Sequence, residues 1–370
     1  MDTFDKNCRR WARRFLAAVL ALLALCAGIV YAIDPCLYYR MPENWKPVFF
    51  NERYQSAGMI KHIPAETVLM GTSMVANIRP SAAAEAFHST ALRITIPDGY
   101  FSEFDQAADL LFRAQDPKRL VFCLDMNTLI RDPSGVTGAM PACLYDQNPF
   151  NDAEYLLNKD TLYYSLYVLL ANSWGGGQDL DESFLWNDGT VWERYEALRT
   201  YRRPDLSETV QPDDAYLAST DENLSVLTGW FQAHPDTEFI VYFAPYSILA
   251  WDRATRRGEL GARFAALERA CQTLTAFENA SLYAPLFDRE IVENLDNYCD
   301  YIHHSGEAGR LVLQKIAAGE HRITAQNYAS VLSDWRQFVT SYDYLSIWDD
   351  DFFARWNAAH DAPPVWWGNP

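Results

Sequence analysis

A serine that follows a short apolar run is the first residue of the chain that could do chemistry. Ser73 lies in VLMGTSMVANIRPS (residues 68–81), where Gly71 ends the apolar run and the serine comes two residues later. A serine hydroxyl becomes a nucleophile when a base, usually histidine, accepts its proton and a carboxylate orients that base. Gly-x-Ser also occurs by chance, so the alternative interpretation of Ser73 is a turn residue between a strand and a helix.

The chain has seven histidines, and one pair of them lies near a suitably spaced carboxylate. Asp300 and His303 form a D-x-x-H pattern in NYCDYIHHSG (residues 297–306), with His304 adjacent. One turn of the chain could place the carboxylate of Asp300 beside the imidazole of His303. The alternative is a turn capped by Asp300 with two ordinary polar histidines. The other five histidines are expected at exposed helix or loop ends.

Acyl transfer also needs hydrogen-bond donors where negative charge develops on the substrate oxygen. The backbone N–H of Ser73, the backbone at Gly99 in IPDGYF and the side-chain amide of Asn127 in LDMNTL are candidates, because each follows one of three successive predicted strands. The alternatives are a turn glycine at Gly99 and a helix cap at Asn127.

Aromatic residues elsewhere could contact a carbohydrate. In FAPYSILAW (residues 243–251), Tyr246 could touch a sugar and Trp251 could stack on one. Ordinary core or rim packing is the competing interpretation. The same two interpretations apply to the tryptophans of a long insertion: Trp174, Trp186 and Trp192.

Apolar runs that alternate with helical patterns supply the elements that would position these residues. The expected strands cover residues 67–71, 92–97, 119–125, 238–245 and 281–285. The expected helices cover residues 80–87, 104–115, 216–233, 258–277 and 307–318, with Gly319 as a C-cap. This alternation predicts an α/β fold with a parallel sheet of about five strands, in which ligands bind at the carboxyl ends of the strands.

The remaining segments define a domain plan. We expect a basic leader at 1–14, a transmembrane helix at 15–33, a juxtamembrane linker at 34–65, the main domain at 66–322 with an insertion at 130–214, and a helical tail at 323–370. The insertion contains an aromatic helix, DAEYLLNKDTLYYSLYVLLA, and a Gly-rich turn at 175–177. An insertion of this length usually carries function or structure of its own.

The uncharged run at residues 15–33 is about long enough to cross a bilayer core. Arginines precede it and most acidic residues follow it, so the positive-inside rule predicts a cytoplasmic N-terminus and an extracytoplasmic main domain, in the cell membrane. A cleaved signal peptide is the alternative, and it also places the main domain outside the cytoplasm.

A formal net charge of −18 argues against a nucleic-acid partner. Seven cysteines are present, five of them beyond the apolar run, which permits one or two disulfides without fixing their pairing. None of the cysteines shows the spacing of a zinc site, so we expect no structural metal and no cofactor.

The ordered set of Gly-x-Ser, glycine, asparagine and Asp-x-x-His resembles the four sequence blocks of the SGNH (GDSL-like) hydrolase superfamily. With its apolar N-terminal segment, the chain is most similar to the membrane-anchored, outward-facing branch, which includes teichoic-acid D-alanyl transfer proteins and exopolysaccharide O-acetylation proteins. The resemblance covers about residues 68–319, interrupted by the insertion. Here GTS stands where G-D-S is usual, and Asp125-Met126-Asn127 stands where G-x-N-D is usual.

The resemblance implies a three-layer flavodoxin-like domain and a serine esterase or O-acyltransferase that acts on an envelope or secreted glycan. The resemblance implies that Ser73 is the nucleophile, His303 the general base and Asp300 the acid that orients it. It also implies that Gly99 and Asn127 are the oxyanion donors. A multispanning membrane acyltransferase is an implied partner. Hydrolysis and transfer stay open, as do a lipase and a non-catalytic glycan-binding or assembly protein on the same fold.

Overall fold

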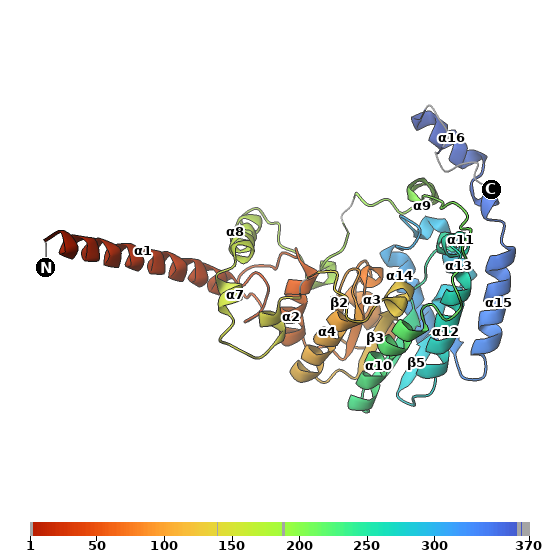
Figure 1. The fold of residues 1–370 in the computed structure, drawn as a ribbon, viewed down its shortest axis with the longest axis horizontal. Helices are drawn as coiled ribbons and strands as arrows, with labels where there is room; N and C mark the ends of the chain where they lie inside the picture. The colour runs from red at the N-terminus through yellow and green to blue at the C-terminus, as the bar shows by residue number, and fades with distance from the viewer. Residues whose placement is uncertain (1–2, 139, 187–188, 361–363, 365–370) are drawn as a thin grey trace. The chain divides into compact units, whose positions relative to one another are not determined.

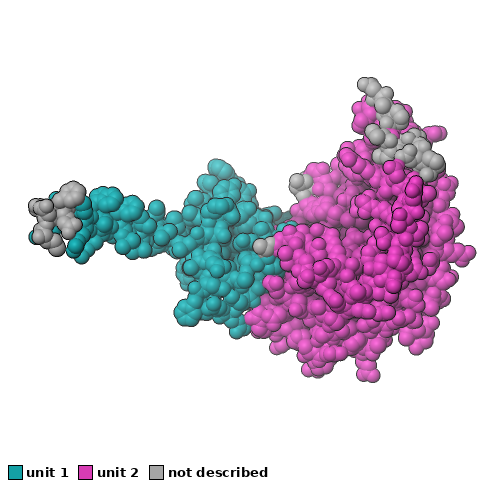
Figure 2. All heavy atoms as spheres, in the orientation of Figure 1, with its two compact units in different colours: residues 1–63, 139–183 teal, residues 64–138, 184–370 magenta. Residues whose placement is uncertain are grey.

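The computed structural model describes residues 3–138, 140–186, 189–360 and 364. The chain forms two compact units, coloured separately in Figure 2. The first unit combines residues 1–63 with 139–183, and the second combines 64–138 with 184–370. Each unit is therefore built from two stretches of chain that are separated in the sequence.

The second unit contains a six-stranded sheet in the order β2-β1-β3-β4-β5-β6. Its strands are β1 Thr67–Gly71, β2 Ala91–Thr95, β3 Arg119–Leu124, β4 Glu238–Phe243, β5 Ala280–Tyr283 and β6 Arg322–Ile323. The first five strands pair in parallel, and β6 pairs antiparallel with β5. The predicted α/β class with a mostly parallel sheet is confirmed. The expectation of about five strands omitted β6, which is only two residues long.

Helices connect these strands and cover the sheet (Figure 1). The longer ones are α3 Pro80–Phe87, α4 Phe101–Ala114, α10 Leu217–Ala233, α11 Ile248–Arg256, α12 Leu260–Leu274, α14 Gly306–Ala317, α15 Tyr328–Ser341 and α16 Asp350–Ala359. The shorter ones are η1 Ser73–Val75, α5 Met126–Ile130, α9 Arg194–Thr200, η3 Pro285–Phe287, α13 Arg289–Val292, η4 Leu295–Asn297 and η5 Tyr344–Ile347. Helix α10 packs against α4 and α12, while α14 packs against α3.

The central strands form the core of this unit. All five residues of β1 are buried, and β3 and β4 are buried beyond their first residue. Continuous burial is expected for parallel strands that have helices on their faces, and it explains why these segments read as unbroken apolar runs. The expected helical tail contains α15 and α16, and residues 361–363 and 365–370 lie outside the described part of the chain.

The first unit contains α1 Thr3–Ile33, α2 Glu52–His62, α6 Ala142–Tyr145, α7 Ala153–Leu156, α8 Lys159–Ser173 and η2 Leu180–Glu182. The stretch interpreted from sequence as a linker thus contains α2, and α7 and α8 stand where one aromatic helix was predicted. The break between them follows from Asn158, whose side chain caps α8 by accepting the N–H of Asp160 at 2.8 Å.

One helix among the described residues is long and apolar enough to cross a membrane. It is the span Lys6–Ile33 of α1. The expected apolar N-terminal helix is therefore present. All seven cysteines, each within the described part of the chain, are free thiols.

Candidate active site

The first element of the site is the turn that follows β1. Gly71 ends the strand, and Thr72 caps the short helix η1 that begins at Ser73. A Cβ atom on Gly71 would lie 2.8 Å from the Cβ of Cys123 and 2.9 Å from a methyl of Val75. The glycine thus permits the close approach of β1 and β3 to the turn, and Ser73 lies at the carboxyl end of the sheet, where parallel sheets bind ligands.

The second element is the loop between η4 and α14. One carboxylate oxygen of Asp300 accepts the backbone N–H of His303 at 2.7 Å and that of Ile302 at 2.8 Å. The loop is closed by a hydrogen bond from the N–H of Cys299 to the carbonyl of His303, at 3.2 Å. The D-x-x-H spacing thus lets Asp300 act twice: one carboxylate oxygen accepts the backbone N–H groups of the turn, and the other faces the imidazole of His303.

The structure brings Ser73, His303 and Asp300 into one hydrogen-bonded chain. The Oγ of Ser73 lies 2.9 Å from the Nε2 of His303, and the Nδ1 of His303 lies 2.6 Å from the Oδ2 of Asp300. Burial alone would raise the pKa of Asp300, but hydrogen bonds from the His303 ring and from the amides of His303 and Ile302 outweigh it and lower the pKa.

These contacts define the proton positions. Because Asp300 is ionised at neutral pH, it accepts the proton on Nδ1 of His303. With that proton on Nδ1, Nε2 is the ring nitrogen that can accept the Ser73 hydroxyl. The arrangement meets the geometric requirement for a serine nucleophile with a general base and an orienting carboxylate.

The adjacent His304 is not a second base of this site. Its Nδ1 donates to the carbonyl of Ser305 at 2.9 Å, and its side chain is almost fully buried. Burial lowers its pKa to about 4, so the ring is neutral at physiological pH. We assign His304 a structural role, because its ring packs against Gly309 of α14.

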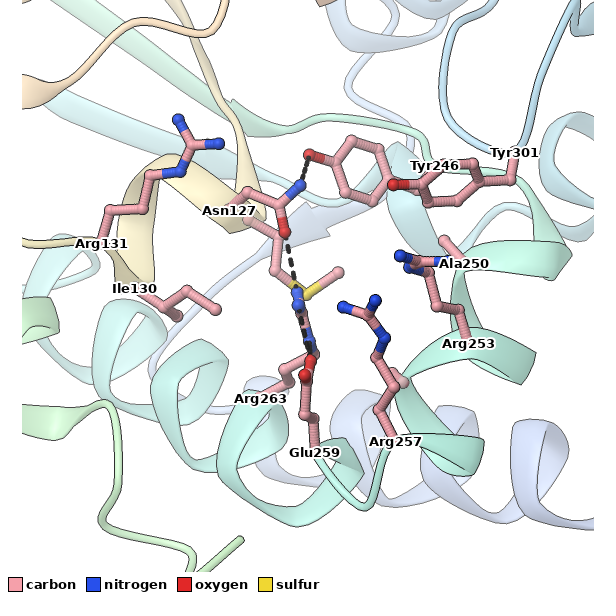
Figure 3. A pocket seen from close by; sticks show the side chains of 12 residues that line it. Asn127, Ile130, Arg131, Tyr246, Ala250, Arg253, Arg257, Glu259, Arg263 and Tyr301 are labelled. Carbon is pink, nitrogen blue, oxygen red and sulfur yellow. Dashed lines mark hydrogen bonds and ion pairs between the residues drawn. The ribbon is translucent and has the colours of Figure 1, made fainter. Parts of the chain in front are cut away.

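The predicted oxyanion donors differ in their availability. Within the described residues, no group accepts a hydrogen bond from the backbone N–H of Ser73. The N–H of Gly99 donates to the carbonyl of Ile96 at 3.0 Å, so it closes a turn. One N–H of the Asn127 amide donates to the Tyr246 hydroxyl at 3.1 Å (Figure 3). The Ser73 amide therefore has no acceptor among the described residues, whereas the N–H of Gly99 and one N–H of Asn127 already have one.

A polar network that sequence reasoning missed joins the loops after β1, β3 and β4. The carboxylate of Asp125 accepts the Thr72 hydroxyl at 3.0 Å and also the hydroxyl of Tyr246. The same carboxylate caps α5 through the N–H of Asn127, at 2.8 Å. Thr72, the residue before Ser73, is thus tied to the neighbouring strand end. The partners lie far apart in sequence, so no local pattern could have revealed them.

The two residues predicted to bind a sugar are buried. Tyr246 is 2% exposed, and its hydroxyl belongs to the Asp125 network. Trp251 is 0% exposed and packs with Phe264, Phe287 and Trp335. The prediction that Trp251 stacks on a sugar is corrected accordingly, because its ring faces the core from α11. The core interpretation of this aromatic segment is the better one.

Trp186 lies beside the catalytic histidine candidate. Its ring centroid is 4.8 Å from that of His303 with the planes tilted by 58°, and Trp192 stacks on Trp186 at 5.8 Å. Asn77, which follows η1, accepts the backbone N–H of Trp186 at 3.0 Å. The sequence indicated these two residues through the tryptophan content of the insertion. The third tryptophan of that set, Trp174, belongs to the first unit and is 82% exposed.

No group of three or more His, Cys, Asp or Glu side chains in the described ranges is placed to hold a metal ion. No family model, characterised protein or solved structure matches the chain significantly.

Proposed function

We propose that this protein is an extracytoplasmic serine esterase or O-acyltransferase of the SGNH type, anchored by α1. The observation that carries the proposal is the hydrogen-bonded chain from Ser73 through His303 to Asp300. In the reaction, His303 takes the proton of the Ser73 hydroxyl as Oγ attacks an ester carbonyl. The protonated imidazole, stabilised by Asp300, then gives that proton to the leaving alcohol.

The architecture supports the same class. The strand order β2-β1-β3-β4-β5 is that of flavodoxin-like doubly wound sheets. Right-handed crossovers in this order put α3 and α14 on one face of the sheet and α4, α10 and α12 on the other. The packing of α3 with α14, and of α10 with α4 and α12, agrees with that three-layer arrangement.

The charge distribution supports an outward orientation. Arg9, Arg10, Arg13 and Arg14 precede the apolar part of α1, so the positive-inside rule keeps this end in the cytoplasm. The catalytic domain then faces the envelope. Its acyl acceptor would be water in an esterase, or a hydroxyl of an envelope or exported glycan in a transferase. A multispanning membrane acyltransferase is the kind of partner that could supply the acyl group.

The test is covalent labelling of the full chain in membranes by a fluorophosphonate, which captures an activated serine. We expect labelling of the wild type, and none in Ser73→Ala or His303→Ala. Matched controls are Ser225→Ala and His360→Ala, which change exposed residues outside the site and should label normally. Absence of labelling in the folded wild-type chain, together with no ester turnover, would refute the catalytic proposal.

A second candidate is a non-catalytic glycan-binding or assembly protein. The observation that favours it is that the N–H of Gly99 and one N–H of Asn127 already have partners, which leaves fewer donors for an oxyanion. This candidate predicts that the chain retains glycan binding while the fluorophosphonate labels no residue. Serine-specific labelling would exclude it.

A further inference from the structure

A pocket rich in arginine lies at the carboxyl edge of the sheet. Its volume is about 260 Å³, and α5, α11, α12 and the loop before α14 all contribute to it (Figure 3). The polar side chains that matter here are Asn127, Arg131, Arg253, Arg257, Arg263 and Tyr301. The only acidic side chain in its lining, among the described residues, is Glu259.

The arginines differ in how far they are neutralised. Arg131 forms an ion pair with Asp98 at 2.5 Å, and Arg263 binds Glu259 through two nitrogens at 3.0 and 2.9 Å. Within the described part of the chain, Arg253 and Arg257 have no carboxylate partner. Arg253 instead lies over the ring of Tyr301, 5.1 Å from its centroid. Two positive charges therefore face the pocket uncompensated.

This is an unusual arrangement in a chain with a net charge of −18. Arg253 lies in the last turn of α11 and Arg257, four residues later, is its C-cap, and like charges at this spacing repel each other. A bound anion would relieve that repulsion. Guanidinium groups offer paired N–H donors that match the oxygens of a phosphate or a carboxylate, and they are less strongly hydrated than ammonium groups.

The pocket adjoins the Ser73 site. Tyr301 directly follows Asp300, and the ring of Tyr301 lines the pocket. Asn127 also lines it, and its helix is capped by Asp125, which binds the hydroxyl of Thr72 beside the nucleophile. The pocket and Ser73 thus share the loops after β1, β3 and β5 at one edge of the sheet.

We propose that this pocket is a subsite for an oxyanionic substituent, a phosphate or a carboxylate, carried by the substrate of the Ser73 site. The assignment rests on the proposed function for its link to catalysis. Arg253 and Arg257 supply the charge, Tyr301 backs Arg253, and Arg263 is held in place by Glu259 and Asn127. The substrate class is thus an anionic rather than a neutral glycan or lipid-linked donor.

The test measures binding of inorganic phosphate and, separately, acetate to the full chain in nanodiscs by calorimetry. We expect saturable one-to-one binding of at least one anion, weakened tenfold or more in Arg253→Gln/Arg257→Gln. Arg202→Gln/Arg310→Gln, which removes two arginines outside the pocket, should bind like the wild type. The preferred anion identifies a phosphate-bearing or a carboxylate-bearing substrate. Absence of binding, or equal weakening in both variants, would overturn the subsite.

Two additions keep this test independent of folding and of catalysis. The single variant Arg257→Gln changes an exposed residue and should weaken binding even if the double variant is unstable. Ser73→Ala should bind the anion as the wild type does. If Ser73→Ala binds the anion but the wild type is not labelled by a fluorophosphonate, the proposed catalysis fails and the anion site stands. Labelling without anion binding refutes the subsite alone.

A separate observation concerns helix α8 of the first unit. Residues 161–178 carry no charge, and much of the apolar surface of α8 is exposed. The exposed large side chains on and next to the helix are Tyr163, Leu166, Tyr167, Leu169, Leu170 and Trp174. A helix that carries charge only at its first two residues and exposes so many apolar groups is poorly suited to water.

The neighbour of α8 explains this composition. Helix α8 packs against α1 within the first unit. The residues of α1 that are shielded lie near its C-terminal end, at Cys26, Ala27, Ile29, Val30 and Ile33, whereas residues 6–25 are exposed. The contact with α8 therefore falls at the end of the apolar span, where a transmembrane helix leaves the hydrocarbon.

We infer that α8 lies in the outer interface of the bilayer, beside the point where α1 emerges. Its leucines would enter the acyl region, and its tyrosines and Trp174 would lie at the headgroup level that aromatic residues favour. This second membrane contact requires that α1 crosses the bilayer, but it does not depend on the reaction at Ser73.

The test places benzoylphenylalanine at Leu166 or Leu170 in the full chain, reconstitutes it in phosphatidylcholine nanodiscs and detects adducts by mass spectrometry after irradiation. We expect lipid adducts at both positions. The control is Leu311 on α14, which is also exposed but belongs to the second unit, and it should give none. A lack of lipid adducts at 166 and 170, or equal yields at 311, would overturn the interfacial placement.

Discussion

Replacement of Asp300 by asparagine is the most direct probe of the hydrogen-bonded chain at Ser73. The Oδ1 of asparagine can still accept the two backbone N–H groups of the loop, at 2.7 and 2.8 Å in the wild type. The other oxygen, now an NH₂ group, faces Nδ1 of His303 as a donor. The imidazole then adopts the tautomer that carries its proton on Nε2, and the base that accepts the Ser73 proton is lost.

The magnitude follows from these bonds. Loss of one hydrogen bond to a charged group costs about 1.5–3 kcal/mol, which alone corresponds to a slowing of roughly 10- to 150-fold. The wrong tautomer adds to this loss, and in a serine triad the total reaches about 10⁴. We therefore expect Asp300→Asn to slow fluorophosphonate labelling by about 10³–10⁴, or about 4–5.5 kcal/mol in the barrier.

The assay is the second-order rate constant of labelling at neutral pH, with the thermal midpoint measured in parallel. Asp109→Asn is the matched control, because it makes the same chemical change in an exposed carboxylate that pairs with Arg113 on the surface of α4. It should label at the wild-type rate. Labelling of Asp300→Asn within about tenfold of the wild type, at unchanged folding, would refute the tautomer argument, since the bond alone predicts a loss of at least about tenfold.

Three further predictions concern stability. The carboxylate of Asp288 binds Lys315 at 2.7 Å and His321 at 2.9 Å. Burial alone would raise the pKa of Asp288, but the hydrogen bonds and charges of these two partners outweigh burial and lower the pKa to about 2. Because the folded-state pKa is lowered, the stabilisation of about 2 kcal/mol is present above about pH 4 and is lost as the pH falls towards 2. Urea titrations should show Asp288→Asn less stable by that amount at pH 7 and equal to the wild type near pH 2; a constant difference would contradict this. Gly71→Ala should cost about 1–3 kcal/mol, since its Cβ would lie 2.8 Å from the Cβ of Cys123, and an unchanged urea midpoint would refute the close approach. Trp251→Ala should cost about 3–5 kcal/mol because the ring is fully buried, whereas a residue that served only as a sugar platform would leave the midpoint unchanged.

The sheet could be predicted from sequence because its strands are short, continuous apolar runs. The predicted strand at 67–71 coincides with β1, and the expected helix at 80–87 coincides with α3. Strand β6 has only two residues and pairs antiparallel, so it leaves no periodic signal. Helix α11 was not predicted: it has only nine residues, and its apolar first residues, 248–251, continue the apolar run of β4, so the sequence shows no separate helical pattern there.

The candidate site was predictable only where its chemistry is local. Asp300 and His303 are three residues apart, so their spacing could be interpreted, and a serine at a strand end completed the set. The partners of Asn127 could not be found in this way, because Tyr246 lies 119 residues later and Arg263 lies 136 residues later. Trp251 could not be placed from sequence for another reason. The sequence does not show whether an aromatic residue in a helix after a strand faces solvent or the core.

The discontinuous first unit has a consequence for the order in which the chain matures. The stretch 1–63 contains Cys36, whose N–H donates to the hydroxyl of Tyr155 in the stretch 139–183, and that hydroxyl in turn donates to Asp34 at 2.8 Å. During synthesis, residues 64–138 separate the two stretches, a delay of roughly 4–15 s at about 5–20 residues per second. Throughout that interval α1 and α2 exist without α7 and α8, while β1, β2 and β3 are already available to pair. A ribosome that stalls in this window would leave α1 and α2 without their partners, and the backbone N–H of Cys36 and the carboxylate of Asp34 without the Tyr155 hydroxyl that binds them in the finished fold.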